Sequence, residues 1–387
     1  MKILLVHCHY RLPGGEDAVF AAERAMLERH GHEVLVYERS NEEAAHGLPK
    51  ALLPLHAVWN RAAARDVKRI IKTKNVDAVH IHNTLLLLSP AVVRAAKRTG
   101  VPVVQTLHNF RLFCPNGILL RGGQVCEDCP RHGLACAVRH RCYRGSLAQT
   151  LVVAAAYGLH RLLGTWRGVT MVALTEFDRR KLLEFNRLHP MFDADRLVVK
   201  PNPVCVPDGP VTPWENRKNQ MLFAGRLEDL KGLRTVLEAW RLLGDAPTLL
   251  VAGEGPLGDW ARAKNLPTVR FLGQLSRTEL HARMAESRAV VAASLCYESF
   301  ALVPAEAHAL GTPVLASDLG NVGASVQPGV DGLRFTPGDA NALAGAVRAL
   351  GQMSFDCNAI AARARRTYSE EENYNALMRF YTKGTTK

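Results

Sequence analysis

The sequence predicts an α/β protein built from two doubly wound domains, each with a parallel sheet between layers of helices. Three observations carry this prediction. Short apolar runs, typical of buried parallel strands, recur along the chain at the spacing of βαβ units. Amphipathic helical stretches separate most of these runs. The 387 residues, 48% of them apolar, are enough for two domains with a core each.

The strand-like runs fall into two groups. The first half of the chain contains KILLVH, EVLVYE, AVHIH, VPVVQTLH and MVALT, followed by RLVVKPNPV, which runs into a link. The second half contains QMLFAG, TLLVAG, VRFLG, AVVAAS and PVLAS. The link, Lys200–Trp214, carries five prolines and predicts a domain boundary. We therefore expect domains at residues 1–200 and 201–365, with a C-terminal helix at 366–387 that packs back on the first domain. Ligands of such sheets bind beyond the strand ends, so we expect the site in the cleft between the domains.

The start of the chain, MKILLVHCHY, has too few apolar residues for a signal peptide and predicts a strand. No apolar stretch reaches the length that spans a bilayer. We therefore expect a cytoplasmic protein whose nine cysteines are mostly reduced.

Positive charge is concentrated in the first half of the chain. Residues 1–200 hold 29 basic and 17 acidic residues, whereas residues 201–387 hold 20 and 19. A basic half indicates an anionic partner, such as a phosphorylated substrate, an anionic membrane surface or nucleic acid. Ala51–Lys74 mixes apolar and basic residues, which suits either a helix lying on a membrane or a solvated helix face.

Two acids, Glu298 and Glu306, flank an apolar turn. AVVAAS predicts a strand just before Glu298, and Pro304 predicts a helix that starts near Val303 and carries Glu306. Both carboxylates would then face the crevice at the strand ends. The alternative is one surface acid and one acid on a solvated helix face.

Cations and glycines follow other predicted strands. Arg226 and Lys231 lie after QMLFA and would suit a diphosphate, since arginine offers a fork and lysine a point charge. Gly14 and Gly15, after the first strand, would let backbone amides approach a phosphate. GEGPLG, which begins at Gly253, matches G-x-G-x-x-G, but the next strand lacks the acid that binds ribose in nicotinamide enzymes. A dinucleotide site is therefore not favoured.

Histidines and cysteines form two further groups. His80, His82 and His108 end predicted strands, which favours a binding role for at least one of them. Five cysteines fall within an insert at residues 113–145, and their spacing suits a structural zinc site with four thiolates. A redox role for the C-x-x-C pair and simple unliganded thiols are the alternatives. The expected zinc ligands are Cys114, Cys126, Cys129 and Cys142, with Cys136 as a spare.

Taken in order, these motifs resemble the retaining glycosyltransferases of the GT-B fold, family four. ESFALVPAEAHALGTPV is similar to the family's Glu-x7-Glu signature. AGRLEDLKGL, GEGPL, FLGQLS, NPV and PGGED have the family's order and spacing. LHNFRLFCPNG followed by cysteines is similar to a bacterial subgroup associated with surface-polysaccharide assembly.

The resemblance implies a role for each motif. Glu306 would hold the ribose of a nucleotide-sugar donor, and Glu298 would bind hydroxyls of the transferred sugar. Arg226 and Lys231 would neutralise the diphosphate leaving group without a metal ion or other cofactor. His108 would touch the transferred sugar. The remaining expected donor contacts are Gly14, Gly15, Gly253, Glu254 and the backbone amides of Ser299, Phe300, Ala301 and Leu302.

The sequence departs from the family in two places. Ala301 stands where the family often has glycine, and Ala324 stands near a common acid. We expect a hexosyltransferase that uses a UDP- or GDP-sugar and a lipid-linked or glycan acceptor, cytoplasmic or peripheral on the inner membrane face. The alternatives are a GT-B epimerase or phosphorylase, and a non-catalytic protein that binds sugar nucleotides or nucleic acid. The few aromatic residues in the cysteine insert argue against nucleic acid.

Overall fold

The chain forms two compact units. A computed structural model describes every residue except 11–13, 44–51, 208 and 383–387. Unit 1 comprises residues 1–121, 126–203 and 370–387, and unit 2 comprises residues 122–125 and 204–369. The chain leaves unit 1 after Pro203, close to the expected boundary at residue 200. The expected C-terminal helix at 366–387 is α17 (Glu370–Thr382), and residues 383–387 lie outside the described part.

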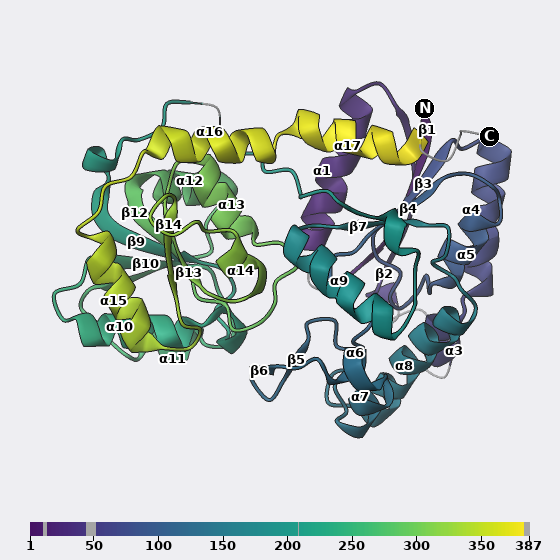
Figure 1. The fold of residues 1–387 in the computed structure, drawn as a ribbon, viewed down its shortest axis with the longest axis horizontal. Helices are drawn as coiled ribbons and strands as arrows, with labels where there is room; N and C mark the ends of the chain where they lie inside the picture. Colours follow the sequence, from purple (N-terminus) through teal and green to yellow (C-terminus); the bar gives the residue numbers. More distant parts are fainter. Residues whose placement is uncertain (11–13, 44–51, 208, 383–387) are drawn as a thin grey trace. The chain divides into compact units, whose positions relative to one another are not determined.

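Within the described residues, unit 1 holds a six-stranded parallel sheet with the strand order β2-β1-β3-β4-β7-β8 (Figure 1). Its strands are β1 (Lys2–His9), β2 (Glu33–Ser40), β3 (Ala78–Ile81), β4 (Val103–Thr106), β7 (Thr170–Ala173) and β8 (Leu197–Val199). Chain order reverses between β1 and β3, so the residues that follow these two strands meet at a switch point.

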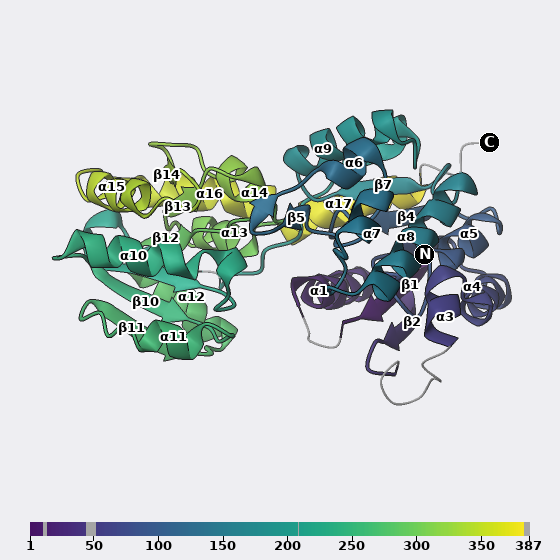
Figure 2. The ribbon, with the colours of Figure 1, turned by 90° about the horizontal axis from the view of Figure 1, so that it is seen from below.

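Helices cover both faces of this sheet. Ile3 and Leu5 of β1 pack with α1 (Gly15–Arg29) and α17, and the side chains between them point to the opposite face. Helices α4 (Arg61–Lys74) and α5 (Ala91–Lys97) lie side by side (Figure 2). Unit 1 also contains α3 (Leu53–Val58), α8 (Leu147–Leu162) and α9 (Glu176–Leu188). The cysteine insert contains β5 (Leu120–Arg121), β6 (Gln124–Val125), α6 (Asp128–His132) and α7 (Ala135–Arg139).

Unit 2 holds a second sheet of six parallel strands among its described residues, in the order β11-β10-β9-β12-β13-β14. Its strands are β9 (Lys218–Ala224), β10 (Thr248–Ala252), β11 (Val269–Gly273), β12 (Ser287–Ala292), β13 (Val314–Ser317) and β14 (Gly332–Phe335). The order reverses between β9 and β12. The prediction of two doubly wound parallel sheets is confirmed.

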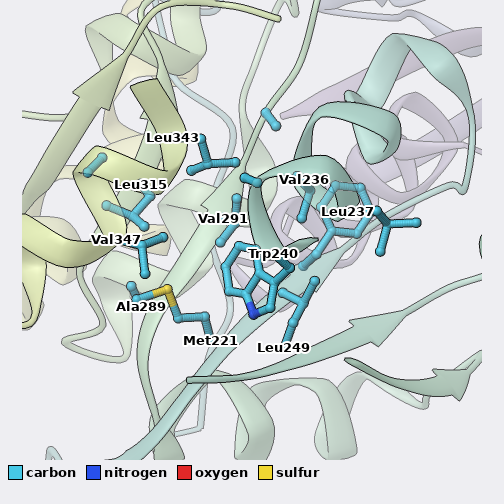
Figure 3. Close-up of a cluster of buried hydrophobic side chains, with 14 of the residues drawn as sticks. Met221, Val236, Leu237, Trp240, Leu249, Ala289, Val291, Leu315, Leu343 and Val347 are labelled. Carbon is cyan, nitrogen blue, oxygen red and sulfur yellow. The ribbon is translucent and has the colours of Figure 1, made fainter. Parts of the chain in front are cut away.

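The core of unit 2 explains why its strands read as continuous apolar runs. Met221, Val291 and Leu315 face Trp240 and its neighbours on one side of the sheet (Figure 3). Leu222 and Val290, one position away, face a second cluster on the other side. The first face is covered by α10 (Leu233–Leu243), α11 (Gly258–Arg262), α15 (Ala340–Leu350) and α16 (Cys357–Thr367). The second is covered by α12 (Arg277–Glu286), α13 (Leu302–Ala309) and α14 (Gly320–Ala324).

One strand of the two six-stranded sheets escaped the sequence analysis. β14 has the sequence GLRF, which is only four residues long and carries an arginine. It is a strand because the backbone of Val314–Ser317 pairs with it, a long-range contact that no local pattern reveals. None of the helices in the described ranges combines the length and apolar character needed to cross a bilayer.

Candidate functional site

The switch point of unit 2 gathers the predicted charged residues. β9 ends at Ala224 and β12 at Ala292, and the two strands are neighbours in the sheet. Arg226 follows β9, Lys231 ends the short helix η4 (Asp229–Lys231), and Glu298 lies in the loop after β12. Open parallel sheets bind ligands at this kind of position.

Lys231 and Glu298 form an ion pair. The Nζ atom of Lys231 lies 2.8 Å from Oε1 of Glu298, and both side chains are more than two-thirds buried. The Ser294 hydroxyl donates a hydrogen bond to the same carboxylate oxygen. Burial disfavours the Lys231 ammonium, but the charge of Glu298 and its hydrogen bond outweigh burial and raise the pKa of Lys231. Lys231 is therefore charged at neutral pH.

Close backbone contacts explain two glycines of the motifs. Gly232 has a φ of +73°, and a Cβ atom there would lie 2.0 Å from the carbonyl oxygen of Ala293. Gly253 has a φ of +124°, and its Cβ would lie 2.0 Å from the carbonyl oxygen of Gly225. Only glycine permits these loops to approach one another so closely.

A cavity of about 310 Å³ lies beside Arg226. It is lined by Ala224, Gly225, Arg226, Ala252, Gly253, Glu254, Gln274, Leu275, Leu280 and Val303. Its size and mixture of apolar and polar walls suit part of a small organic ligand. Gln274, Leu275 and Leu280 were not predicted, although FLGQLS marked the end of β11. Arg226 is 53% exposed and pairs with Glu228 at 3.3 Å.

Glu306 lies on α13, the helix that also brings Val303 to the cavity. Its Oε1 atom accepts a hydrogen bond from Arg277 at 3.0 Å, and Nε2 of His281 lies 3.6 Å away. Oε2 has no hydrogen bond to the described residues and can accept one from a ligand. Arg277 and His281 come from α12 and were missed, because only the packing of α12 against α13 brings them to Glu306.

In the loop before α13, the backbone amide of Leu302 differs from the expectation that it contacts the donor. The Asn321 side chain donates hydrogen bonds to the carbonyl oxygens of Glu298 and Ser299, which fixes the loop from its carbonyl side. The Leu302 amide donates to the Phe300 carbonyl at 3.0 Å and is not free for a ligand. Ala301 has a φ of −83°, an ordinary value for alanine, so the departure from the family's glycine is tolerated.

The glycine turn of unit 1 also differs from expectation. The Gly14 amide donates to Oδ2 of Asp17 at 2.8 Å, so it is not available for a phosphate. Gly14 has a φ of −136°, and a Cβ there would meet nothing within 4 Å. Oδ1 of Asp17 lies 2.9 Å from ring nitrogens of both His7 and His9. The turn is thus held by Asp17 at the start of α1, where Gly15 is the first residue.

Only one of the three predicted histidines is left with a nitrogen for a ligand. His80 is fully buried, and its ring nitrogens bond to the hydroxyls of Tyr381 and Thr106. His82 is buried and bonds to His108. His108 is partly exposed, and its Nδ1 atom makes no hydrogen bond to the described residues. His80 and His82 therefore offer no ring nitrogen to a ligand, and His108 is the candidate among the three.

Several cysteines of the insert influence one another's pKa. Burial and the neighbouring Cys114, Cys142 and Cys136 raise the pKa of Cys129 to about 12. Burial and the neighbouring Cys114 and Cys126 raise the pKa of Cys142. All nine cysteines are free thiols. Among the described residues, two groups of three side chains bring potential metal ligands within 4.8 Å, and neither contains a cysteine. These groups are His7, His9 and Asp17, and Glu23, His80 and His82.

Two family models match the chain. One, described as Glycosyltransferase Family 4, matches residues 13–205, and the other, described as Glycosyl transferases group 1, matches residues 218–352. The structure of Anabaena Alr3699/HepE in complex with UDP superposes with a TM-score of 0.63 over 99% of this chain and all of that one, at 18% identity. A likeness at this identity shows the fold.

Most curated relatives match this chain over only part of its length. Glycogen synthase of Mycobacterium tuberculosis is 40% identical over 139 residues, which are 34% of this chain and 33% of that protein. D-inositol 3-phosphate glycosyltransferase of a Nocardioides species is 30% identical over 339 residues, 78% of this chain and 65% of that one. The chain thus spans about a third of the length of the glycogen synthase that it matches.

Two parallel doubly wound units define the class of this protein, which is the GT-B fold. The order of the two family matches then defines the family. The chain belongs to the family 4 glycosyltransferases.

Proposed function

We propose that this chain is a retaining, metal-independent hexosyltransferase that uses a nucleoside diphosphate sugar in the synthesis of a cell-surface glycan. The observation that carries the proposal is the Lys231–Glu298 ion pair at the switch point, beside Arg226 and the cavity. The Anabaena protein of the same fold has been solved with UDP and with UDP-glucose, which supports a nucleotide-sugar donor.

Each residue has a chemical task in this proposal. Cleavage of the bond between the anomeric carbon and the diphosphate leaves negative charge on the phosphate oxygens. Lys231 and Arg226 stabilise that charge without a metal ion. Glu298 accepts hydrogen bonds from sugar hydroxyls, and Oε2 of Glu306 accepts from a ribose hydroxyl. The acceptor hydroxyl attacks on the face that the diphosphate leaves, and its proton passes to the departing phosphate oxygen.

The direct test is product release from a panel of UDP- and GDP-sugars, with lipid-linked glycans as acceptors. We expect one donor to release its nucleoside diphosphate and to give a product with the donor's anomeric configuration. Glu298→Ala should reduce release at least 100-fold. Glu238→Ala, which removes an exposed acid on α10, should not.

Other results would favour the alternatives. Inverted configuration contradicts a retaining mechanism. Tight RNA binding without release favours a nucleic-acid protein, and a changed donor sugar without transfer favours an epimerase.

The acceptor surface is proposed to lie on unit 1, against an anionic membrane. Helix α3 packs against α8, and both expose leucines, among them Leu55 at 65% and Leu162 at 83%. A cavity of about 580 Å³ beside α3 includes Leu55, Arg61 and Arg65 in its lining. Apolar side chains beside arginines match an interface of acyl chains and phosphates. Ala51, the start of the predicted segment, lies outside the described residues.

Sedimentation with vesicles checks this surface. We expect binding to phosphatidylglycerol vesicles that weakens with salt and is much weaker with phosphatidylcholine alone. Leu55→Glu combined with Leu162→Glu should reduce binding at least tenfold, because each change places a charge where an apolar side chain enters the interface. Leu188→Glu on α9, which is also exposed, is the matched control. Equal binding of all variants would contradict the assignment.

The cysteine insert is proposed to hold a structural zinc ion through Cys114, Cys126, Cys129 and Cys142. The thiols of Cys129 and Cys142 resist deprotonation because each thiolate would be buried near other cysteines. A divalent cation would remove that penalty, and thiolates are ligands that zinc prefers. The zinc would fix α6 and α7, which are five residues each and too short to be stable alone.

Metal analysis of the purified chain should find close to one zinc per chain. Cys129→Ser should release zinc and make residues 113–145 sensitive to protease, because α6 and α7 lose their cross-link. Cys136→Ser should retain the metal. Under half an equivalent of zinc in the unaltered protein would contradict the site.

A further inference from the structure

We propose that Glu23 and His82 position His108 and determine which of its ring nitrogens carries the hydrogen, so that Nδ1 of His108 accepts a hydrogen bond from a ligand hydroxyl. The identity of the ligand as a sugar rests on the proposed function. The assignment of donor and acceptor along Glu23, His82 and His108 depends only on contacts within unit 1.

The three side chains form a continuous row. Nδ1 of His82 lies 3.0 Å from Nε2 of His108, and the two rings stack with centroids 5.2 Å apart. Nε2 of His82 lies 3.4 Å from Oε2 of Glu23. These last two atoms are buried and make no other hydrogen bond, and the contact of 3.4 Å between them is longer than an ordinary hydrogen bond between a histidine and a carboxylate. Each is therefore the partner that the other needs.

Glu23 is a carboxylate despite its complete burial. Burial alone would raise the pKa of Glu23, but the Lys200 ammonium, 2.6 Å from Oε1, holds it well below its usual value. Lys200 is equally buried and also donates to the Asn373 side chain. A carboxylate only accepts hydrogen bonds, so Nε2 of His82 carries a hydrogen.

The charge on Glu23 then determines which ring nitrogens of His82 and His108 carry hydrogen. Lys200 already neutralises Glu23, so a second positive charge on His82 would be an unbalanced buried charge. A His82 ring that carries one hydrogen holds it on Nε2, the nitrogen that faces the Glu23 carboxylate, and its Nδ1 accepts. Nε2 of His108 must then donate to it. Burial holds the pKa of His108 well below its usual value, so His108 is neutral and its Nδ1 keeps a lone pair.

A lone pair at this position selects for a hydrogen-bond donor. A sugar hydroxyl can donate to Nδ1, whereas a fluorine in its place cannot. His82 and Glu23 are positioning residues in this arrangement, and His108 is the residue that touches the ligand.

Nitrogen-15 NMR of the histidine rings in the whole chain shows directly which ring nitrogen of each histidine carries hydrogen. The His108 signals, assigned by their loss in His108→Asn, should show hydrogen on Nε2. His82→Leu should abolish that preference, and His82→Asn should keep it, because the asparagine oxygen can take the place of Nδ1. His80→Asn is the matched control, since His80 lies on β3 two residues before His82 and 3.6 Å from Glu23, but its ring nitrogens bond to Tyr381 and Thr106 rather than to His108.

Hydrogen on Nδ1 in the unaltered protein overturns the proposal without any variant, and so does an unchanged preference in a folded His82→Leu. Donor analogues give a second readout. Two donor analogues replace the hydroxyl that His108 contacts, one with hydrogen and one with fluorine. Both should show kcat/KM reduced by the same factor, about tenfold or more. Activity retained by the fluoro donor alone would mean that His108 donates. If no sugar nucleotide reacts, the proposed function fails while the NMR result still decides the hydrogen order.

Discussion

Lys231→Met is expected to lower kcat/KM for sugar transfer by about 1,000-fold, the loss typical of one preorganised group that stabilises developing charge. The ammonium is more than two-thirds buried, so solvent screens it little. Arg226 is 53% exposed and already near Glu228. Arg226→Met should therefore cost less, about tenfold to 100-fold. Steady-state kinetics with the donor found in the panel measure both.

The ion pair requires a control, because Lys231→Met leaves the Glu298 carboxylate without its partner. The double variant Lys231→Met with Glu298→Gln separates this effect from the loss of the cation. If Lys231 acts on the diphosphate, the double variant stays at least as inactive as the single one. Recovery of activity in the double variant would mean that the lysine merely balances Glu298. Lys218→Met, which removes an exposed lysine paired with Glu286, should leave kinetics unchanged.

Much of the fold was predictable because the inner strands of these sheets are largely buried on both faces. Runs such as KILLVH and TLLVA contain the side chains of both faces in turn, and a continuous apolar run is the result. β14 was missed because its GLRF sequence gains its structure from pairing with β13.

The residues of the candidate site that lie in loops after strands were predictable, because local sequence patterns locate the strand ends. Arg226 and Glu298 lie in the loops that follow β9 and β12, so local patterns placed both at the switch point. The residues that were missed depend on packing between distant segments. Arg277 reaches Glu306 from another helix, and Glu23 resembles any acid on an amphipathic helix until the fold buries it. Gly14 is the opposite case, a residue that was predicted to bind a ligand. Its amide donates to the Asp17 side chain instead.

Glu23→Gln is expected to destabilise unit 1 by about 3–5 kcal/mol, because it leaves the Lys200 ammonium buried without a counter-charge. Hydrogen exchange followed by mass spectrometry resolves the effect by region, which suits a chain with two units better than a single melting curve. Peptides of β1, β3 and α17 should exchange much faster in the variant. Peptides of unit 2 serve as the internal control. Equal acceleration in both units, or none, would contradict this account.

The same ion pair fixes the sign of a pH effect. The pKa of Glu23 in the folded chain lies well below the ordinary value of 4.5, so its contribution to stability is present above that value and is lost as the pH falls through the lower folded pKa. The unaltered protein should thus lose protection of unit 1 in acid more steeply than Glu23→Gln. Replacing both partners, with Glu23→Gln and Lys200→Met together, should cost less than Glu23→Gln alone, because an unpaired buried charge is worse than an absent pair.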